Sequence, residues 1–397
     1  MKNVIQAIQQ QKLHPENSIC AYYYDLDVLR THLSQVMSTL PSTCQMFYAM
    51  KANSDPRILE VVSKYVHGFE VASLGEIHKA RAISANIPLM FGGPGKTDVE
   101  IRGAIAQNIK FFNVESIQEL RRIQLIARAM NRVVSILLRV NIGGSLPSAT
   151  LQMAGRPTQF GIDELNLEAA ITLATSSPYI KLQGFHFHSI SNNLDYLQHL
   201  ELINYYINKV KNWIEIYKLN IDYINFGGGI GVNYFDLNRQ FNWSDFTSNL
   251  QYLLASTNLE NTTFLFECGR FLTAFCGFYA VEVLDIKRNH GKDFVITQGG
   301  TQHFRLPVSW NHNHPLTVVP IEQWHYPFER QAVSSSEVTI VGQLCTPKDV
   351  FAKNVFVKTI RLGDVILFLY TGAYGWAISH HDFLSHPHPQ KFYLEAP

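Results

Sequence analysis

The amino-acid sequence predicts an α/β protein made of a (β/α)8 barrel followed by a β domain. Three observations support this prediction. Short apolar runs alternate with amphipathic segments of helical length up to about residue 270. Beyond that point, strand-like runs follow one another with turn-rich connections between them. Finally, charged and glycine-rich motifs stand where the predicted barrel strands end, which is where barrels carry their functional residues.

Eight strand-like runs can be counted in the first part of the chain. They lie near residues 45–50, 68–72, 88–92, 110–114, 133–141, 180–188, 221–227 and 262–267. Segments such as 116–129 and 197–217 separate them and are long enough for helices. This rhythm fits a (β/α)8 barrel, although periodicity alone also allows a doubly wound sheet.

The last part of the chain predicts a separate β domain. Its strand-like runs lie near 277–287, 293–297, 336–341, 354–360 and 364–370. The segment 18–24, ICAYYYD, is also strand-like, and we expect it to pair with this late domain rather than with the barrel. The predicted domains are therefore a barrel at 25–270 and a discontinuous β domain at 1–24 and 271–397.

The composition indicates a protein that acts on a small molecule. The chain has 33 Lys and Arg against 32 Asp and Glu and shows no basic stripe, which argues against nucleic-acid and membrane-surface partners. Its five cysteines have no CxxC spacing, and neither a signal peptide nor a long apolar span is visible. We therefore expect a reduced, cytoplasmic protein.

Lys51 ends the apolar run FYAM and opens the turn KANSDP, at the end of the first predicted barrel strand. We expect it to be buried there, where a buried strand meets a turn. Desolvation would then favour the neutral amine, which can attack a carbonyl carbon. The structural alternative is a solvated or ion-paired lysine, which is the commoner fate of a single lysine at a strand end.

Other predicted strand ends also carry polar residues or glycines. They are Glu70, Arg139, His188, the run Gly227, Gly228 and Gly229, and the pair Glu267 and Arg270. Because the carboxyl ends of barrel strands meet at one mouth, we expect these residues to lie together. Of His186 and His188, which belong to one predicted strand, we expect at most one to point into this site.

Each of these motifs has a structural explanation as well as a functional one. The glycine run can form a tight turn, or its bare backbone amides can bind a phosphate group. Glu267 ends an apolar strand and needs a partner, which Arg270 could be. Together, however, a lysine, a glycine loop, a histidine and a carboxylate meet the needs of pyridoxal 5'-phosphate (PLP).

These motifs resemble those of the fold-type III PLP enzymes of the ornithine/diaminopimelate decarboxylase group, over nearly the whole chain. The resemblance implies an alanine-racemase-like barrel and makes Lys51 in YAMKAN the Schiff-base lysine. It makes His188 in FHSIS the histidine that stacks on the ring, and Glu267 in ECGR the partner of the ring nitrogen. The remaining cofactor contacts that we predict are Glu70, Arg139, Ser191, Gly228, Gly229 and Arg270.

The late motifs GQLCTPKD and GAYG resemble two further segments of these enzymes. The resemblance implies a homodimer with shared active sites, in which a second subunit delivers Cys345 as the leading proton donor. It also implies that Tyr374 contacts the phosphate. Thr346 stands where the family usually has an acidic residue that recognises a distal ammonium group, which argues against ornithine or lysine as the substrate.

Narrower motifs, among them MAGRPTQFGI, HFHSISNN, GGTQHFRLPVSWNHNHP and GAYGWAISHHDFLSHPHP, resemble the siderophore-biosynthesis decarboxylases of the staphyloferrin B type. This resemblance implies that citryl-diaminopropionate loses carbon dioxide to leave citryl-ethylenediamine, in a pathway of iron acquisition. Arg305 resembles an arginine that binds a substrate carboxylate. Further cationic candidates for this polyanionic substrate are Arg156, Lys348, His380 and His381.

Other functions remain open on the sequence alone. A diaminopimelate or other diamino-acid decarboxylase would use the same cofactor site. An amino-acid racemase usually has an arginine in place of Glu267, and a non-catalytic PLP carrier would lack the long β domain. The C-terminal histidines also allow a zinc site, but the prolines among them favour a packed loop, and we predict no metal.

Overall fold

The computed structural model describes all residues except 15–17, 144–150, 153–156 and 397, and of 151–152 it describes the backbone alone. By their internal contacts, the described residues form two compact units. The barrel unit comprises residues 32–233 and 238–272, and the β unit comprises 1–31, 234–237 and 273–397. The domain boundaries that we predicted lie after residues 24 and 270, and they stay a prediction beside this division.

The barrel unit contains a closed ring of parallel strands. In order around the ring these are β2 (Cys44–Ala49), β3 (Gly68–Val71), β4 (Leu89–Phe91), β5 (Phe111–Val114), β6 (Val134–Asn141), β9 (Ile180–His186), β11 (Tyr223–Asn225) and β12 (Thr263–Cys268). The pairing of β12 with β2 closes the ring, as does that of β5 with β6. The predicted (β/α)8 barrel is confirmed, and the doubly wound sheet, which would have open edges, is excluded.

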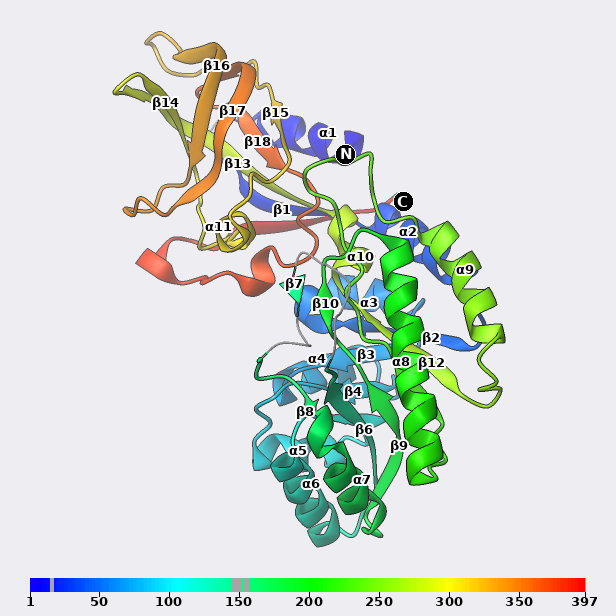
Figure 1. The fold of residues 1–397 in the computed structure, drawn as a ribbon. Helices are drawn as coiled ribbons and strands as arrows, with labels where there is room; N and C mark the ends of the chain where they lie inside the picture. The colour runs from blue at the N-terminus through cyan, green and yellow to red at the C-terminus, as the bar shows by residue number, and fades with distance from the viewer. Residues whose placement is uncertain (15–17, 144–150, 153–156, 397) are drawn as a thin grey trace. The chain divides into compact units, whose positions relative to one another are not determined.

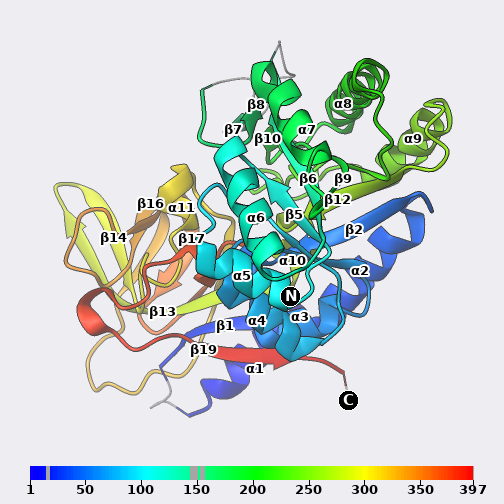
Figure 2. The same cartoon turned by 90° about the horizontal axis from the view of Figure 1, so that it is seen from below.

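Helices follow the barrel strands and lie outside them (Figures 1 and 2). They are α3 (Pro56–Val62), α4 (Leu74–Ile83), α5 (Asp98–Ala106), α6 (Ile117–Ala129), α7 (Leu167–Thr175), α8 (Tyr196–Tyr217), α9 (Trp243–Ala255) and the short α10 (Arg270–Thr273). Ser73, Thr97 and Ser116 cap α4, α5 and α6, because each side-chain oxygen accepts a bond from a backbone N–H of the first turn. Polar residues in the loops after buried strands thus start the helices.

Large apolar side chains fill the middle of the barrel. Phe47, Met90, Phe111, Leu137 and Leu265, from five of its strands, pack together and are at most 1% exposed. Three short strands accompany the ring: β7 (Leu151–Gln152), β8 (Ile162–Asp163) and β10 (Ile190–Ser191). The packed interior leaves the strand ends as the place for a ligand.

The β unit is built on a mixed sheet in the order β15-β18-β13-β14-β16-β17, with β1 and β19 beside β13. Its strands are β1 (Cys20–Asp25), β13 (Gly277–Asn289), β14 (Lys292–Thr297), β15 (Leu316–Val319), β16 (Ala332–Val341), β17 (Val350–Arg361), β18 (Val365–Phe368) and β19 (Gln390–Leu394). Its helices include α1 (Lys2–Gln11) and α11 (Leu306–Trp310), while α2 (Leu26–Thr39) leads to β2. Because β1 pairs with β13, the predicted pairing of 18–24 with the late domain is confirmed.

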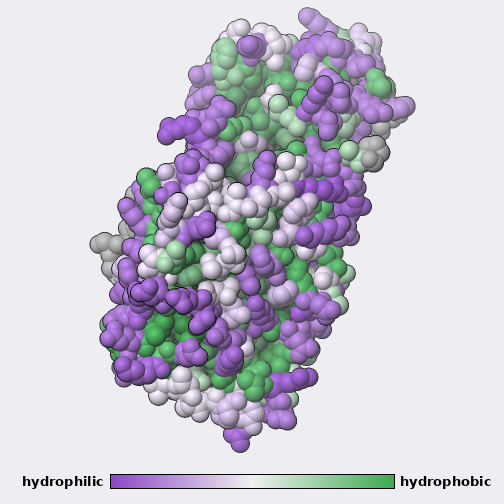
Figure 3. All heavy atoms as spheres, turned by 90° about the vertical axis from the view of Figure 1, so that its right-hand side faces the viewer, coloured by the Kyte–Doolittle hydropathy of each residue, from purple (hydrophilic) through white to green (hydrophobic). Residues whose placement is uncertain are grey.

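On the face in Figure 3, hydrophilic residues surround smaller groups of apolar ones. Within the part of the chain that the structure describes, no helix is both long and apolar enough to cross a membrane.

Candidate active site

Lys51 and Glu70 form an ion pair where two neighbouring barrel strands end. Lys51 lies in a 3-10 turn (Met50–Ala52) directly after β2, and Ala49 of β2 stands opposite Glu70 of β3. The Lys51 Nζ atom is 3.2 Å from Glu70 Oε2 and 3.4 Å from Oε1. Burial raises the pKa of Glu70, and the nearby Lys51 acts in the opposite direction.

The predicted burial of Lys51 is wrong. Its side chain is 44% exposed, whereas that of Glu70 is 5% exposed. The strand ends at Ala49, and the turn that follows carries Lys51 beyond the packed interior. The alternative of an ion-paired strand-end lysine is the one that the structure bears out, and the exposed amine remains accessible to a small molecule.

Glu267 of β12 is held from one side by two buried amides. Its Oε1 atom accepts hydrogen bonds from Asn113 Nδ2 at 2.8 Å and from Asn225 Nδ2 at 2.7 Å. His186 Nε2 lies 3.3 Å from its other oxygen, Oε2. These three side chains are partners of Glu267 that the sequence analysis did not name, and the suggested pairing of Glu267 with Arg270 stays a prediction.

This surrounding keeps Glu267 ionised. Burial by itself would raise its pKa, but His186 and Lys51 outweigh that effect and hold the pKa below its ordinary value. Asn113 and Asn225 were missed on the sequence. Each is an amide near the end of an otherwise apolar strand, in FFNV and YINF, and that contrast was the available signal.

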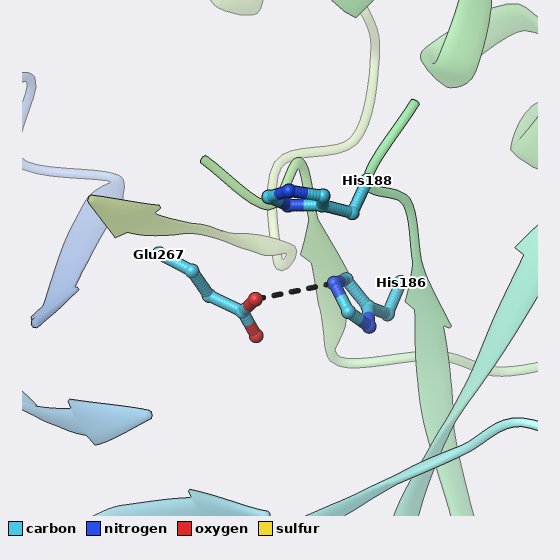
Figure 4. A group of neighbouring side chains, drawn as sticks. All are labelled: His186, His188 and Glu267. Atoms are coloured by element: carbon cyan, nitrogen blue, oxygen red, sulfur yellow. Dashed lines mark ion pairs between the residues drawn. The ribbon is translucent and has the colours of Figure 1, made fainter. Parts of the chain in front are cut away.

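His186 and His188 both approach Glu267, so the expectation that only one would point into the site is wrong. Figure 4 shows the two imidazoles beside the carboxylate, with ligand atoms of all three side chains within 4.8 Å of one another. The reason is geometric: side chains two residues apart along an extended chain share a face, and His188 lies two residues beyond His186, where β9 ends. The expectation applied this rule incorrectly.

His188 is oriented by the glycine loop. Its Nδ1 atom accepts a hydrogen bond of 3.2 Å from the Gly228 N–H, so the neutral ring carries its proton on Nε2. Burial, reinforced by Arg139 and Lys51, lowers its pKa well below the ordinary value. The ring is therefore neutral. Because Nδ1 of His188 and Oε1 of Glu267 already have donors, the group favours an organic ligand over a metal ion.

The loop after β11 can be formed only by glycine. Gly227 and Gly229 have φ values of +69° and +96°. A Cβ on Gly228 would collide with the Glu267 carbonyl oxygen. The strand segment of Ser191 runs alongside, because the Asn193 N–H donates to the Gly229 carbonyl at 2.7 Å. Bare backbone beside a serine fits the phosphate group of PLP.

Arg139, near the end of β6, is held by a second carboxylate that was missed on the sequence. Its Nη1 atom is 2.6 Å from Glu115 Oε1, and both side chains are less than a tenth exposed. Glu115 also accepts the backbone N–H groups of Gly93 at 2.9 Å and Gly161 at 3.1 Å. Arg270 is buried at the start of α10.

The other predicted site residues belong to the β unit. Cys345 is exposed on a loop that the buried Asp349 organises, with its carboxylate accepting the Thr301 N–H at 2.7 Å and the Leu344 N–H at 2.9 Å. Thr346 lies in the same loop.

The remaining candidates lie outside this loop or at its end. Tyr374 is half-buried with φ +54°. Arg305 is exposed, and its backbone N–H donates to Ser379 Oγ at 3.0 Å. Lys348 and His380 are exposed, and Arg156 lies outside the described residues.

The C-terminal histidines make contacts within their own segment and with a neighbouring loop. His381 stacks on Trp376 with ring centres 3.6 Å apart. His388 Nε2 is 2.8 Å from Asp382 Oδ1, and Gln343 Nε2 donates to His386 Nδ1 at 2.6 Å. These contacts describe a packed, hydrogen-bonded loop.

Comparisons with known proteins agree with the arrangement of the barrel. The family model described as "Pyridoxal-dependent decarboxylase, pyridoxal binding domain" matches residues 26–274. The chain is 51% identical to the Staphylococcus aureus 2-[(L-alanin-3-ylcarbamoyl)methyl]-2-hydroxybutanedioate decarboxylase, over 98% of each chain. It is 32% identical to the L-glutamyl-[BtrI acyl-carrier protein] decarboxylase of Niallia circulans, over 93% of this chain and 87% of that protein. The crystal structure of Helicobacter pylori diaminopimelate decarboxylase complexed with L-lysine superposes with a TM-score of 0.85 at 27% identity, over 97% of this chain and 94% of the other.

Proposed function

The chain belongs to the pyridoxal-dependent decarboxylases, and we propose that it decarboxylates citryl-diaminopropionate to citryl-ethylenediamine in siderophore biosynthesis. The support for this substrate is the 51% identity, over 98% of the chain, to the Staphylococcus aureus enzyme. The substrate named for that enzyme is an amide of citrate with 2,3-diaminopropionate. Removal of its amino-acid carboxylate leaves an ethylenediamine amide.

The observation that carries the chemistry is the ionised Glu267 in the same barrel mouth as the exposed Lys51. PLP supplies an aldehyde that binds amines and a ring that accepts the electron pair left by a departing carboxylate. In our proposal Lys51 carries the cofactor covalently and yields its place to the substrate amine. Glu267 would hold the proton on the ring nitrogen of the cofactor, and His188 would fix one face of the ring.

The remaining roles in the barrel follow from position. We assign the phosphate to Gly228, Gly229, Ser191 and Arg270, and the resemblance to the family adds Tyr374 of the β unit as a further contact. Glu70 orients the Lys51 amine through its ion pair, and Arg139 lies close enough to keep His188 neutral.

Substrate recognition is assigned to the β unit. We propose that the enzyme is a cytoplasmic homodimer in which Cys345 of a second subunit returns a proton to the substrate carbon. Thr346 leaves no acidic partner for a distal ammonium group, which suits a substrate with distal carboxylates. Arg305, exposed on the β unit, is the proposed partner of one such carboxylate.

The test is a substrate panel with the purified, PLP-loaded protein. Citryl-diaminopropionate, diaminopimelate, ornithine and lysine are supplied separately, and carbon dioxide release and product mass are followed. We expect loss of one carbon dioxide from the citryl compound alone. Turnover of diaminopimelate or of a basic amino acid instead would keep the chemistry and overturn the substrate. An Arg305→Ala variant should raise KM for the citryl compound, with Lys287→Ala, an exposed residue of the same unit, as the control.

A further inference from the structure

A second lysine–glutamate pair lies in the barrel unit and is sealed from water. Lys96 precedes α5, and Glu119 lies in the first turn of α6. Lys96 Nζ is 2.5 Å from Glu119 Oε1, and the two side chains are 0% and 7% exposed. Burying two charges is costly unless their remaining hydrogen-bonding capacity is used, so the partners of this pair show what it does.

Those partners are backbone groups at the end of β5 and just after β4. Besides Glu119, Lys96 Nζ donates to the carbonyl oxygens of Asn113 and Gly93, each at 2.9 Å. The other Glu119 oxygen, Oε2, accepts the N–H of Glu115 at 2.8 Å. The pair therefore holds residues 113 and 115 by their backbones, one by its carbonyl and one by its amide.

The side chains of Asn113 and Glu115 contact charged residues of the candidate active site. Asn113 donates to Glu267, and Glu115 pairs with Arg139. Gly93 links the two halves, because its carbonyl accepts from Lys96 while its N–H donates to Glu115 Oε1. The network thus runs from a buried ion pair, through one strand end, to two of the charged groups in the barrel mouth.

We propose that Lys96 and Glu119 are positioning residues that set Glu267 and Arg139 through Asn113 and Glu115. The inference rests on the cofactor roles proposed for Glu267 and Arg139, and is independent of the identity of the substrate. It predicts that moving the end of β5 changes how the protein holds the cofactor ring. A pair that served stability alone would leave the cofactor's environment unaltered.

The test measures PLP in the absence of substrate. The dissociation constant of PLP and the pH dependence of its visible absorption are compared among the wild type, Lys96→Met, Glu119→Gln and the double variant. We expect Lys96→Met to weaken PLP binding by about tenfold and to shift the pH profile, because the Asn113 carbonyl loses its donor. Glu119→Gln keeps an acceptor for the Glu115 N–H and should change both quantities less.

The double variant distinguishes the effect of moving the end of β5 from the effect of leaving one buried charge without its partner. It leaves no uncompensated buried charge, so it is expected to fold even if Lys96→Met does not, and it should still shift the profile. Recovery of wild-type affinity and profile in the double variant would overturn the proposal. The control is Lys209→Met, which breaks an ion pair of 2.7 Å with Glu164 in the same unit and should alter neither quantity. Failure of the wild type itself to bind PLP would contradict the proposed function instead.

Discussion

The two lysine–glutamate pairs of the barrel unit have the same charges and opposite exposure. Lys51 and Glu70 are 3.2 Å apart, and Lys51 is 44% exposed. Lys96 and Glu119 are 2.5 Å apart, and neither side chain is more than 7% exposed. The comparison shows that ion pairing by itself says little about a lysine's role, whereas access to its amine separates a reactive group from a structural one.

Local chain geometry produces the difference. Lys51 lies in a 3-10 turn that leaves the packed end of β2. Lys96 directly precedes Thr97, the N-cap of α5, and its ammonium lies 5.4 Å from the centre of the Phe91 ring. The Lys51 side chain is therefore partly in contact with water, whereas the Lys96 side chain is covered.

Removing the exposed amine should have the largest effect on function. We expect Lys51→Ala to lower turnover by about 1000-fold or more and to abolish the covalent link to PLP, because the variant lacks the amine that we propose as the nucleophile. Borohydride reduction followed by peptide mass measurement locates the link. Lys64→Ala, an exposed lysine of the same unit, is the control. Full turnover by Lys51→Ala would remove Lys51 from the mechanism.

Removing the buried amine of Lys96 should have the largest effect on stability. We expect Lys96→Met to lower the free energy of unfolding by about 3–5 kcal/mol, because Glu119 is left as a buried carboxylate without its cation. Urea denaturation of the cofactor-free protein measures this. For Lys51→Ala the expected loss is smaller, about 1 kcal/mol, because truncating a side chain that is 44% exposed lets water reach the Glu70 carboxylate that loses its cation. Equal losses of unfolding free energy in the two variants would contradict the proposed difference between the two ion pairs.

Two buried carboxylates should give stability opposite dependences on pH. The folded-state pKa of Glu267 is lowered, so its contribution is complete above the ordinary value of about 4.3 and is lost as the pH falls toward the folded value. The pKa of Glu70 is raised, so its ionisation in the folded state costs stability as the pH rises above about 4.3.

Denaturation of the cofactor-free protein across this range tests the signs. The difference between wild type and Glu267→Gln should shrink toward acid pH, whereas Glu70→Gln should gain stability relative to wild type as the pH rises. Parallel curves for all three proteins would show that neither carboxylate has the pKa shift described above.

The smallest effect should come from a pair in contact with water. Lys209 and Glu164 are 2.7 Å apart, with side chains 29% and 22% exposed. Lys209→Met should change the free energy of unfolding by about 0.2–1 kcal/mol, because solvent screens such pairs. A loss as large as that for Lys96→Met would mean that exposure is not what distinguishes the pairs.

Much of the fold could be predicted because buried parallel strands are short apolar runs between amphipathic helices. Each of the eight predicted runs overlaps a barrel strand. In the β unit, β15 and β19 were missed because they are short and lie among polar or aromatic residues without alternation.

By itself, the sequence determined the succession of strands and helices, the resemblance to the family and the placing of Lys51, Glu70, His188 and Glu267 at strand ends, which a barrel brings to one mouth. Only the tertiary structure decided which groups touch there. Asn113 reaches Glu267 across 154 residues of chain, and Asn225 reaches it across 42. Strand periodicity specifies the face of the strand that a side chain occupies. Which other side chain it contacts depends on the closure of the barrel, which brings distant strands together. The difference in solvent exposure between Lys51 and Lys96 likewise depends on the tertiary packing.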